Sequence, residues 1–106
     1  EAGQRAFRAM LTAARALVRE RLPDIGEQPA EIVSRFRSEM VDTQLFQDPF
    51  AGAKFAHYLF RAEREAQKPD DAESAHQRIE EAQLFVDASH QCYERLVQAS
   101  APVAAQ

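Results

Sequence analysis

The fold is decided by residues 50–97, which read FAGAKFAHYLFRAEREAQKPDDAESAHQRIEEAQLFVDASHQCYERLV. The first part is rich in Phe and leads through Arg61 to a polar break at Pro69. The second part repeats apolar or small residues at steps that alternate between three and four, which is the spacing of one helix face. These residues are Ala72, Ala75, Ile79, Ala82, Val86, Ser89, Tyr93 and Leu96. The pattern predicts two helices that form a hairpin.

The two helices of this hairpin have recognisable start signals. We expect the first over residues 49–67, because Asp48 can cap its free amides and Pro49 supplies a helical φ angle. We expect the second over residues 71–98, with Asp70 or Asp71 as its cap. Apolar residues lie nearly all round the helix at 49–67, which predicts that it is the most buried one. They are Phe50, Ala53, Phe55, Ala56, Tyr58, Leu59 and Phe60.

Two more amphipathic segments precede this hairpin. Residues 3–22 carry apolar side chains at helical spacing and end before Pro23, and residues 29–45 begin with a Pro that a first helical turn accepts. Short connections marked by Pro favour antiparallel neighbours. The sequence therefore predicts an all-α fold, an antiparallel four-helix up-and-down bundle with Phe60 and Phe85 buried in its core. It forms one domain over residues 1–98, followed by a frayed tail over residues 99–106.

Composition limits the function. The chain has 106 residues, of which 45% are apolar and 28% charged, a balance that can bury one modest core. Its net charge of −4 argues against a general nucleic-acid binder, because such binding depends on Lys and Arg. The lone Cys92 excludes an intramolecular disulfide, and its helical position predicts a small buried hydrophobe.

The chain shows no sign of a membrane or secretory segment. No apolar run approaches the roughly 20 residues that span a bilayer, and no stretch has the layout of a signal peptide. We therefore predict a cytoplasmic protein without a membrane partner. The chain begins at Glu1 without an initiator Met, which fits an excised domain of a larger parent protein or a processed chain.

A metal site is not expected. Glu73 and His76 form a Glu-x-x-His pair, and Asp87 and His90 repeat the spacing fourteen residues later. That separation is about 21 Å along one helix, so the two pairs cannot share a metal within one chain. His57 has no Ser or Cys beside it in the sequence, so it is more simply an ordinary satisfied or half-exposed histidine. We predict no metal and no cofactor.

Arginines are organised along the first helix. Arg5, Arg8, Arg15 and Arg19 fall within a sector of about 80°, away from the centre of the apolar face. Two interpretations remain open. The stripe either binds an acidic partner or a nucleic-acid backbone, or it is a solvated face of good helix formers.

The order of these features resembles the HEPN domains, a family named for nucleotide binding in higher eukaryotes and prokaryotes. The resemblance rests on Phe36 and Thr43, on a capped helix ending in Leu59-Phe60-Arg61, and on a final helix with the Ala-x-x-Phe core Ala82-Gln83-Leu84-Phe85. The run Ala13-Ala14-Arg15-Ala16-Leu17 is similar to the family's small-residue-rich first helix. The resemblance covers about residues 5–97. It implies a helical bundle that pairs as a symmetric dimer.

The chain departs from the ribonuclease members of that family. In those members, an Arg is followed after four to six residues by a His, and the resemblance implies that both act on RNA. Arg61 stands at the Arg position, but Ala66, Gln67 and Lys68 occupy the positions expected for the His. No general acid or base near neutral pH is therefore supplied there. Arg61 either faces a shared cleft in a dimer and binds a phosphate or carboxylate, or pairs with Glu65 on its own helix.

We therefore expect a non-enzymatic, HEPN-like helical interaction or dimerisation domain. Its partner is a second copy of the chain or a larger parent protein. One alternative is an RNA-binding or ribonuclease-type component of a toxin–antitoxin or nucleotidyltransferase pair, which would use Arg61 and the arginine stripe. Another is a structural helical bundle unrelated to HEPN domains.

Overall fold

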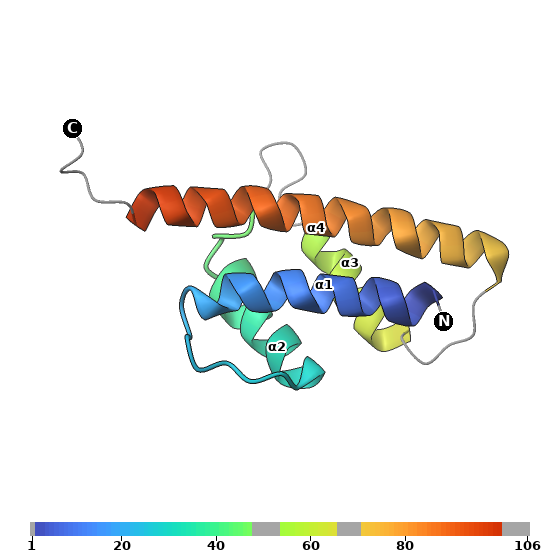
Figure 1. Ribbon diagram of the computed structural model, residues 1–106, viewed down its shortest axis with the longest axis horizontal. Helices are drawn as coiled ribbons and strands as arrows, with labels where there is room; N and C mark the ends of the chain where they lie inside the picture. Colours follow the sequence, from blue (N-terminus) through green and yellow to red (C-terminus); the bar gives the residue numbers. More distant parts are fainter. Residues whose placement is uncertain (1, 48–53, 66–70, 101–106) are drawn as a thin grey trace.

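The computed structural model describes residues 2–47, 54–65 and 71–100, and this part of the chain is helical without a strand (Figure 1). It contains α1 (Ala2–Arg19), α2 (Pro29–Phe36), the π-helical turn η1 (Arg37–Val41), α3 (Lys54–Glu65) and α4 (Ala72–Ser100). The prediction of an all-α fold with four helices is confirmed.

The helix starts were predicted in part. At α4, the backbone N–H of Ser74 donates to Asp71 Oδ1 at 2.7 Å, so Asp71 is the cap. α4 then continues through Ser100, two residues past its expected end at 98. The expected cap at Asp48 and Pro49 lies outside the described residues, as do Phe50, Ala53, Pro69, Asp70 and residues 101–106.

The first two helices end earlier than their apolar patterns predict. α1 ends at Arg19 rather than Leu22, and the N–H of Glu20 turns back to the carbonyl of Leu17, three residues earlier. α2 passes into η1, where the N–H of Asp42 donates to the carbonyl of Arg37, five residues earlier. Gln44 then adopts a φ of 64°, which is incompatible with a right-handed helix. The helical segment that was expected to reach residue 45 therefore stops at Val41.

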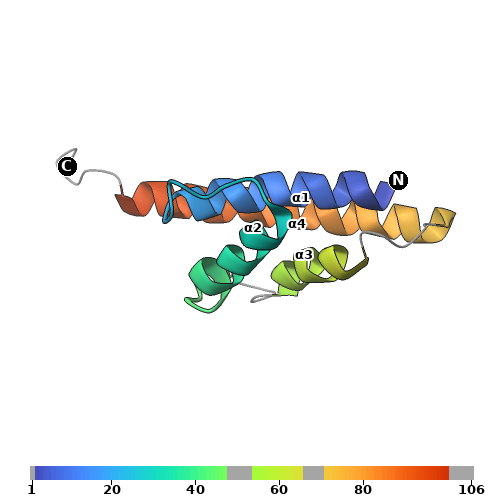
Figure 2. The ribbon, with the colours of Figure 1, turned by 90° about the horizontal axis from the view of Figure 1, so that it is seen from below.

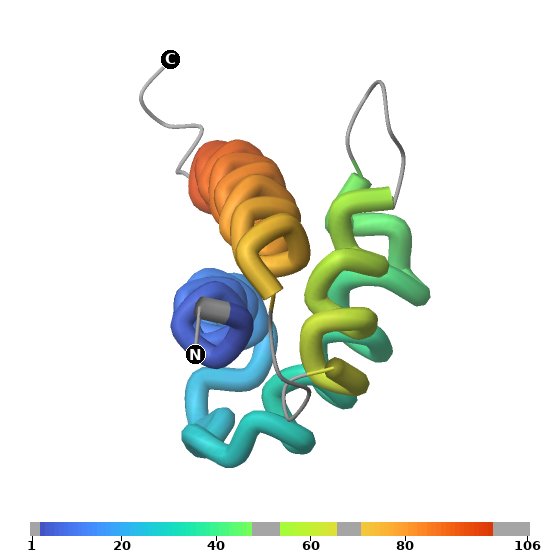
Figure 3. Tube along the Cα trace, turned by 90° about the vertical axis from the view of Figure 1, so that its right-hand side faces the viewer, coloured from blue at the N-terminus to red at the C-terminus, as the bar shows by residue number. Residues whose placement is uncertain are grey.

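The helices form two layers. α1 and α4 lie side by side in one layer, and α2 and α3 cover one side of it (Figures 2 and 3). The opposite side of the α1/α4 layer carries no other described helix (Figure 3). This uncovered side is called the open face below.

α1 and α4 run in the same direction. Both begin at the same end of the molecule (Figure 1), and Arg5 lines a hollow with Ile79 while Arg19 lines one with Tyr93. A strict up-and-down bundle would place these two helices in opposite directions. The expected alternation therefore does not describe this pair.

The reason lies in residues 20–28, which follow α1 backwards instead of forming a short turn. Arg15 holds this return segment, because its Nε donates to the carbonyl of Gly26 at 2.8 Å and its Nη2 to that of Ile25 at 3.2 Å. The buried side chain of Ile25 anchors the same segment in the core. α2 consequently starts beside the middle of α1. The chain therefore reverses its direction once after α1 without forming a helix.

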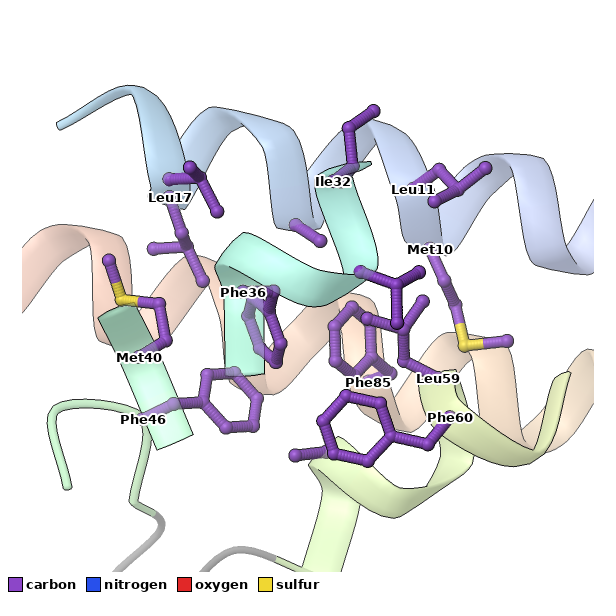
Figure 4. Close-up of a cluster of buried hydrophobic side chains, with 14 of the residues drawn as sticks. Met10, Leu11, Leu17, Ile32, Phe36, Met40, Phe46, Leu59, Phe60 and Phe85 are labelled. Carbon is purple, nitrogen blue, oxygen red and sulfur yellow. The ribbon is translucent and has the colours of Figure 1, made fainter. Parts of the chain in front are cut away.

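Four phenylalanines form the centre of the core. The ring of Phe36 lies 5.1 Å from that of Phe46, 5.5 Å from Phe85 and 6.4 Å from Phe60, each edge to face (Figure 4). These rings come from α2, from the segment before α3, from α3 and from α4. The predicted burial of Phe60 and Phe85 is confirmed, as is that of Cys92.

Two helices are less buried than their sequences suggest. α3 buries Ala56, Leu59 and Phe60, whereas Phe55 and Tyr58 are half-buried, so it is not enclosed on all sides. On α4, the buried row is Ala82, Phe85, Ala88, Ser89 and Cys92. The large residues Ile79 and Tyr93 remain 53% and 40% exposed at the edge of this row.

Candidate functional site

Arg61 forms an ion pair with Glu81 of α4. The Glu81 carboxylate raises the pKa of Arg61, so the guanidinium stays charged. Glu65, the partner expected on the same helix, instead lies 3.7 Å from Arg78, whose Nη1 also donates to the Glu65 carbonyl. Two ion pairs thus connect α3 to α4 in this region.

The hollow beside Arg61 is too small to enclose a ligand. The hollow that Arg61 lines with Tyr58 and Glu81 has a volume of about 10 Å³. That volume is near the minimum for a single water molecule. Within this chain, the arrangement serves to join helices.

The four predicted arginines of α1 have different surroundings. Arg15 is half-buried and holds the return segment through two backbone carbonyls. Arg5, Arg8 and Arg19 are exposed. The stripe is therefore not a uniform surface, because one member has a structural role.

The other candidates do not form a catalytic or metal-binding arrangement in the described residues. No group of three His, Cys, Asp or Glu side chains there could hold a metal ion. His76 approaches Glu80 at 3.6 Å on the same helix, and His57 is exposed beside Phe60. None of the described helices is both long enough and apolar enough to cross a bilayer.

A groove lies between α1 and α4. It consists of two adjoining hollows of about 780 and 500 Å³, and Ala9 and Val86 line both. We define the α1/α4 groove by Ala9, Ala13 and Ala16 on α1 and by Ile79, Val86 and Tyr93 on α4. These residues repeat every three, four or seven positions, so the groove follows both helices along the molecule.

Small residues make the groove possible. Ala9, Ala13 and Ala16 let the two backbones approach closely, while the three α4 residues stand beside them at heptad spacing. Ser89 lies deeper, 2% exposed, and its hydroxyl has no hydrogen-bond partner in the part of the chain that the structure describes. The sequence contained both signals, the alanine repeat and the heptad of Ile79, Val86 and Tyr93. The periodicity predicts a core position for this heptad, whereas Ile79 and Tyr93 lie on an open surface.

Polar residues border the groove with opposite charges. Arg5 and Arg19 lie on its α1 side. Each groove residue of α4 is followed by an acid, giving Glu80, Asp87 and Glu94, and all three are exposed. The groove is thus apolar along its centre, with arginines on its α1 side, and the acids lie on the exposed surface of α4 beyond Gln83 and His90, which line the groove.

Searches against protein-family models, curated proteins and solved structures found no significant match for this chain. The resemblance to HEPN domains stays a prediction from the residues quoted above.

Proposed function

We propose that this chain is a non-catalytic helical interaction domain, an accessory part of a larger assembly, that binds a protein helix in the α1/α4 groove. The observation that carries this proposal is the row of exposed apolar side chains on α4 beside the groove alanines of α1. Ile79, Tyr93 and Val97 are each at least 40% exposed along α4.

An amphipathic helix matches this surface in shape and in chemistry. Helices that bind in grooves insert apolar side chains at spacings of three, four and seven residues, and the α1/α4 groove repeats at those spacings. Fully burying one Ile or Val side chain contributes about 1.5 to 3 kcal/mol. Ile79 and Tyr93 are fourteen residues apart, about four helical turns, so several such contacts can form along the groove.

The non-catalytic part of the proposal rests on Arg61 and its surroundings. The sequence offers Ala66, Gln67 and Lys68 where the family's ribonucleases have a His. Arg61 is already paired with Glu81. An RNA-directed role has less support, since Arg61 and Arg15 are engaged within the chain and only Arg5, Arg8 and Arg19 of the five candidate arginines are exposed.

We also propose a HEPN-like core for this domain. Support comes from the residues that carry the resemblance, because Phe36, Phe60 and Phe85 pack together. Further support comes from the order of the ion pairs between α3 and α4. Glu65 pairs with Arg78 and Arg61 with Glu81, so the two helices meet in opposite directions, as in a helical hairpin.

Site-specific photo-crosslinking tests the groove. A photoreactive residue is placed at Ile79 in the groove or, as a matched control, at Leu84, which is 43% exposed on α4 but does not line the groove. We expect the photoreactive residue at position 79 to cross-link to a partner polypeptide at residues spaced three or four apart. The photoreactive residue at position 84 should cross-link to few residues. Equal yields at both positions, or none at 79, would contradict the proposed function.

A further inference from the structure

We propose that the partner at the α1/α4 groove is the same face of a second copy of this chain, whose α1 and α4 pack against α4 and α1 of the first around a two-fold axis parallel to the groove. This inference rests on the proposed function and names its partner. It is drawn from the direction of the two helices, the charges on the open face and the spacing of those charges.

The open face divides into a basic half and an acidic half. Arg5, Arg8 and Arg19 share a sector of about 60° on α1, on the side opposite the buried Met10 and Leu17. We call these three residues the basic border.

The acidic border consists of Glu80, Asp87 and Glu94, which share a sector of about 40° on α4. That sector lies opposite the buried Phe85 and Cys92. The acidic border therefore lies on the side of α4 that faces away from the core. Arg8 and Arg19 of the basic border also line a hollow with Pro29 and Ile32, so the basic border lies between the open face and the start of α2.

Symmetry then selects one arrangement of two copies. An axis parallel to the groove places α1 of each copy over α4 of the other, so the basic border meets the acidic border twice. An axis perpendicular to the groove places α1 over α1 and α4 over α4, so like charges meet. Because complementary charges favour association and like charges oppose it, the parallel axis is preferred.

The spacing of the charges fits the same arrangement. Arg5 and Arg19 are fourteen residues apart, as are Glu80 and Glu94, which corresponds to about 21 Å in each helix. Arg5 and Ile79 line the hollow near the start of the two parallel helices, and Arg19 and Tyr93 line the one further along, so we place each pair at about the same level (Figure 1). A parallel axis keeps these levels, so Arg5 meets Glu80 and Arg19 meets Glu94 of the other copy.

The apolar centre is also self-complementary. Around a parallel axis, the two grooves face each other, and the Ile79, Val86 and Tyr93 side chains of one copy lie near the alanine row of the other. Four helices then surround one apolar line, which is the arrangement that parallel heptads favour. The second copy removes from water the Ile79 and Tyr93 side chains that a single chain leaves exposed.

Charge exchange tests the partner. Sedimentation velocity on the full chain at about 50 µM should give a dimer. Arg5→Glu with Arg19→Glu, or Glu80→Arg with Glu94→Arg, should each weaken dimerisation at least tenfold, while an equimolar mixture of the two variants should dimerise again. The matched control Arg35→Glu with Arg64→Glu changes exposed arginines of α2 and α3 and should leave the dimer intact. Circular dichroism confirms that each variant is folded.

Cross-linking tests the direction of the axis. In a Cys92→Ala background, chains carrying Arg19→Cys mixed with chains carrying Glu94→Cys should join through a short bis-maleimide. Chains carrying Arg5→Cys mixed with the same Glu94→Cys chains should not join, because those positions lie at opposite ends. The reverse pattern would overturn the parallel axis.

The two proposals fail differently. A wild-type monomer whose position 79 attaches to another protein would overturn the second copy as partner and leave the helix-binding function standing. A dimer that persists in both charge variants would place the interface elsewhere and overturn the inference. A monomer with no attachment at position 79 would overturn both.

Discussion

Ser89 has an unfavourable environment in the folded chain. Its hydroxyl is buried beneath the α1/α4 groove and has no hydrogen-bond partner among the described residues. A buried hydroxyl left without a partner costs about 1 to 3 kcal/mol. We expect Ser89→Ala to raise the free energy of unfolding by about 1 kcal/mol in urea titrations. Ser38→Ala, at an exposed serine, is the control and should change little, and a loss of stability at Ser89 would contradict the structure.

Arg61 should contribute to stability through Glu81. Its side chain is 37% exposed, so solvent screens the pair and the expected contribution is about 0.5 to 1 kcal/mol. A double-mutant cycle of Arg61→Ala and Glu81→Ala should show this coupling in urea unfolding. Arg64 is an exposed arginine on the same helix and provides the matched control. A cycle of Arg64→Ala and Glu81→Ala should show no coupling. Equal coupling in both cycles would disprove a specific pair.

Cys92 should make stability depend on alkaline pH. Burial raises the pKa of its thiol, and nearby Arg95 lowers it by less. An unfolded thiol titrates near pH 8.5. As pH rises above about 8.5, the unfolded chain loses the proton while the folded chain keeps it, so the stabilisation is lost.

The measurement is urea unfolding at pH 7 and pH 10 for wild type and Cys92→Ala. Wild type should lose more stability than the variant between these values. An equal loss would show that Cys92 does not cause it. The Sγ–H also donates to the Leu45 carbonyl at 3.4 Å, so the variant should be less stable at pH 7 as well.

At the scale of elements, the start of α4 was predictable and can be tested. Asp71 accepts the Ser74 N–H, a local contact between residues three apart, and such caps can be recognised in a sequence. Asp71→Ala should lower the free energy of unfolding by about 1 kcal/mol. Asp71→Asn should keep most of the stabilisation that the cap provides, because Asn also caps helices well. Thermal unfolding followed by circular dichroism measures both. Identical losses for Ala and Asn would mean that the side chain does not act as the cap.

The end of α2 was not predictable from apolar spacing. Met40 continues the periodicity and is buried, yet the backbone around it has changed to a π-helical turn and then to the positive φ of Gln44. The apolar side chain at Phe46 is drawn into the core against Phe36 and Phe85, which sets where the helix must stop. Tertiary contacts therefore override the local pattern here.

At the scale of the whole molecule, periodicity indicates which face of a helix is apolar but not which helix covers it. The sequence correctly predicted four helices and the burial of Phe60 and Phe85. It did not predict that α1 and α4 run parallel, because that depends on Arg15 bonding carbonyls ten and eleven residues away. The α1/α4 groove follows from this parallel contact, so it was missed for the same reason.

The last prediction concerns the centre of the core. Phe36 has no exposed surface and packs edge to face against three other rings, which bring together four segments of the chain. Phe36→Ala removes those contacts and leaves a cavity, so we expect a loss of about 3 to 5 kcal/mol. The free energy of unfolding of a small domain is about 5 to 15 kcal/mol in total. The variant should therefore unfold near physiological temperature, or at a temperature well below that of wild type.

Urea and thermal unfolding measure this loss. Phe36→Leu keeps most of the volume and should lose clearly less than Phe36→Ala. Phe55→Ala is the control, because Phe55 is half-buried at the edge of α3 and its main ring contact is with Tyr58 on the same helix. If Phe36→Ala and Phe55→Ala destabilise equally, the four segments do not share one centre. A larger loss at Phe36 with a single transition would show that the α1/α4 and α2/α3 layers unfold together.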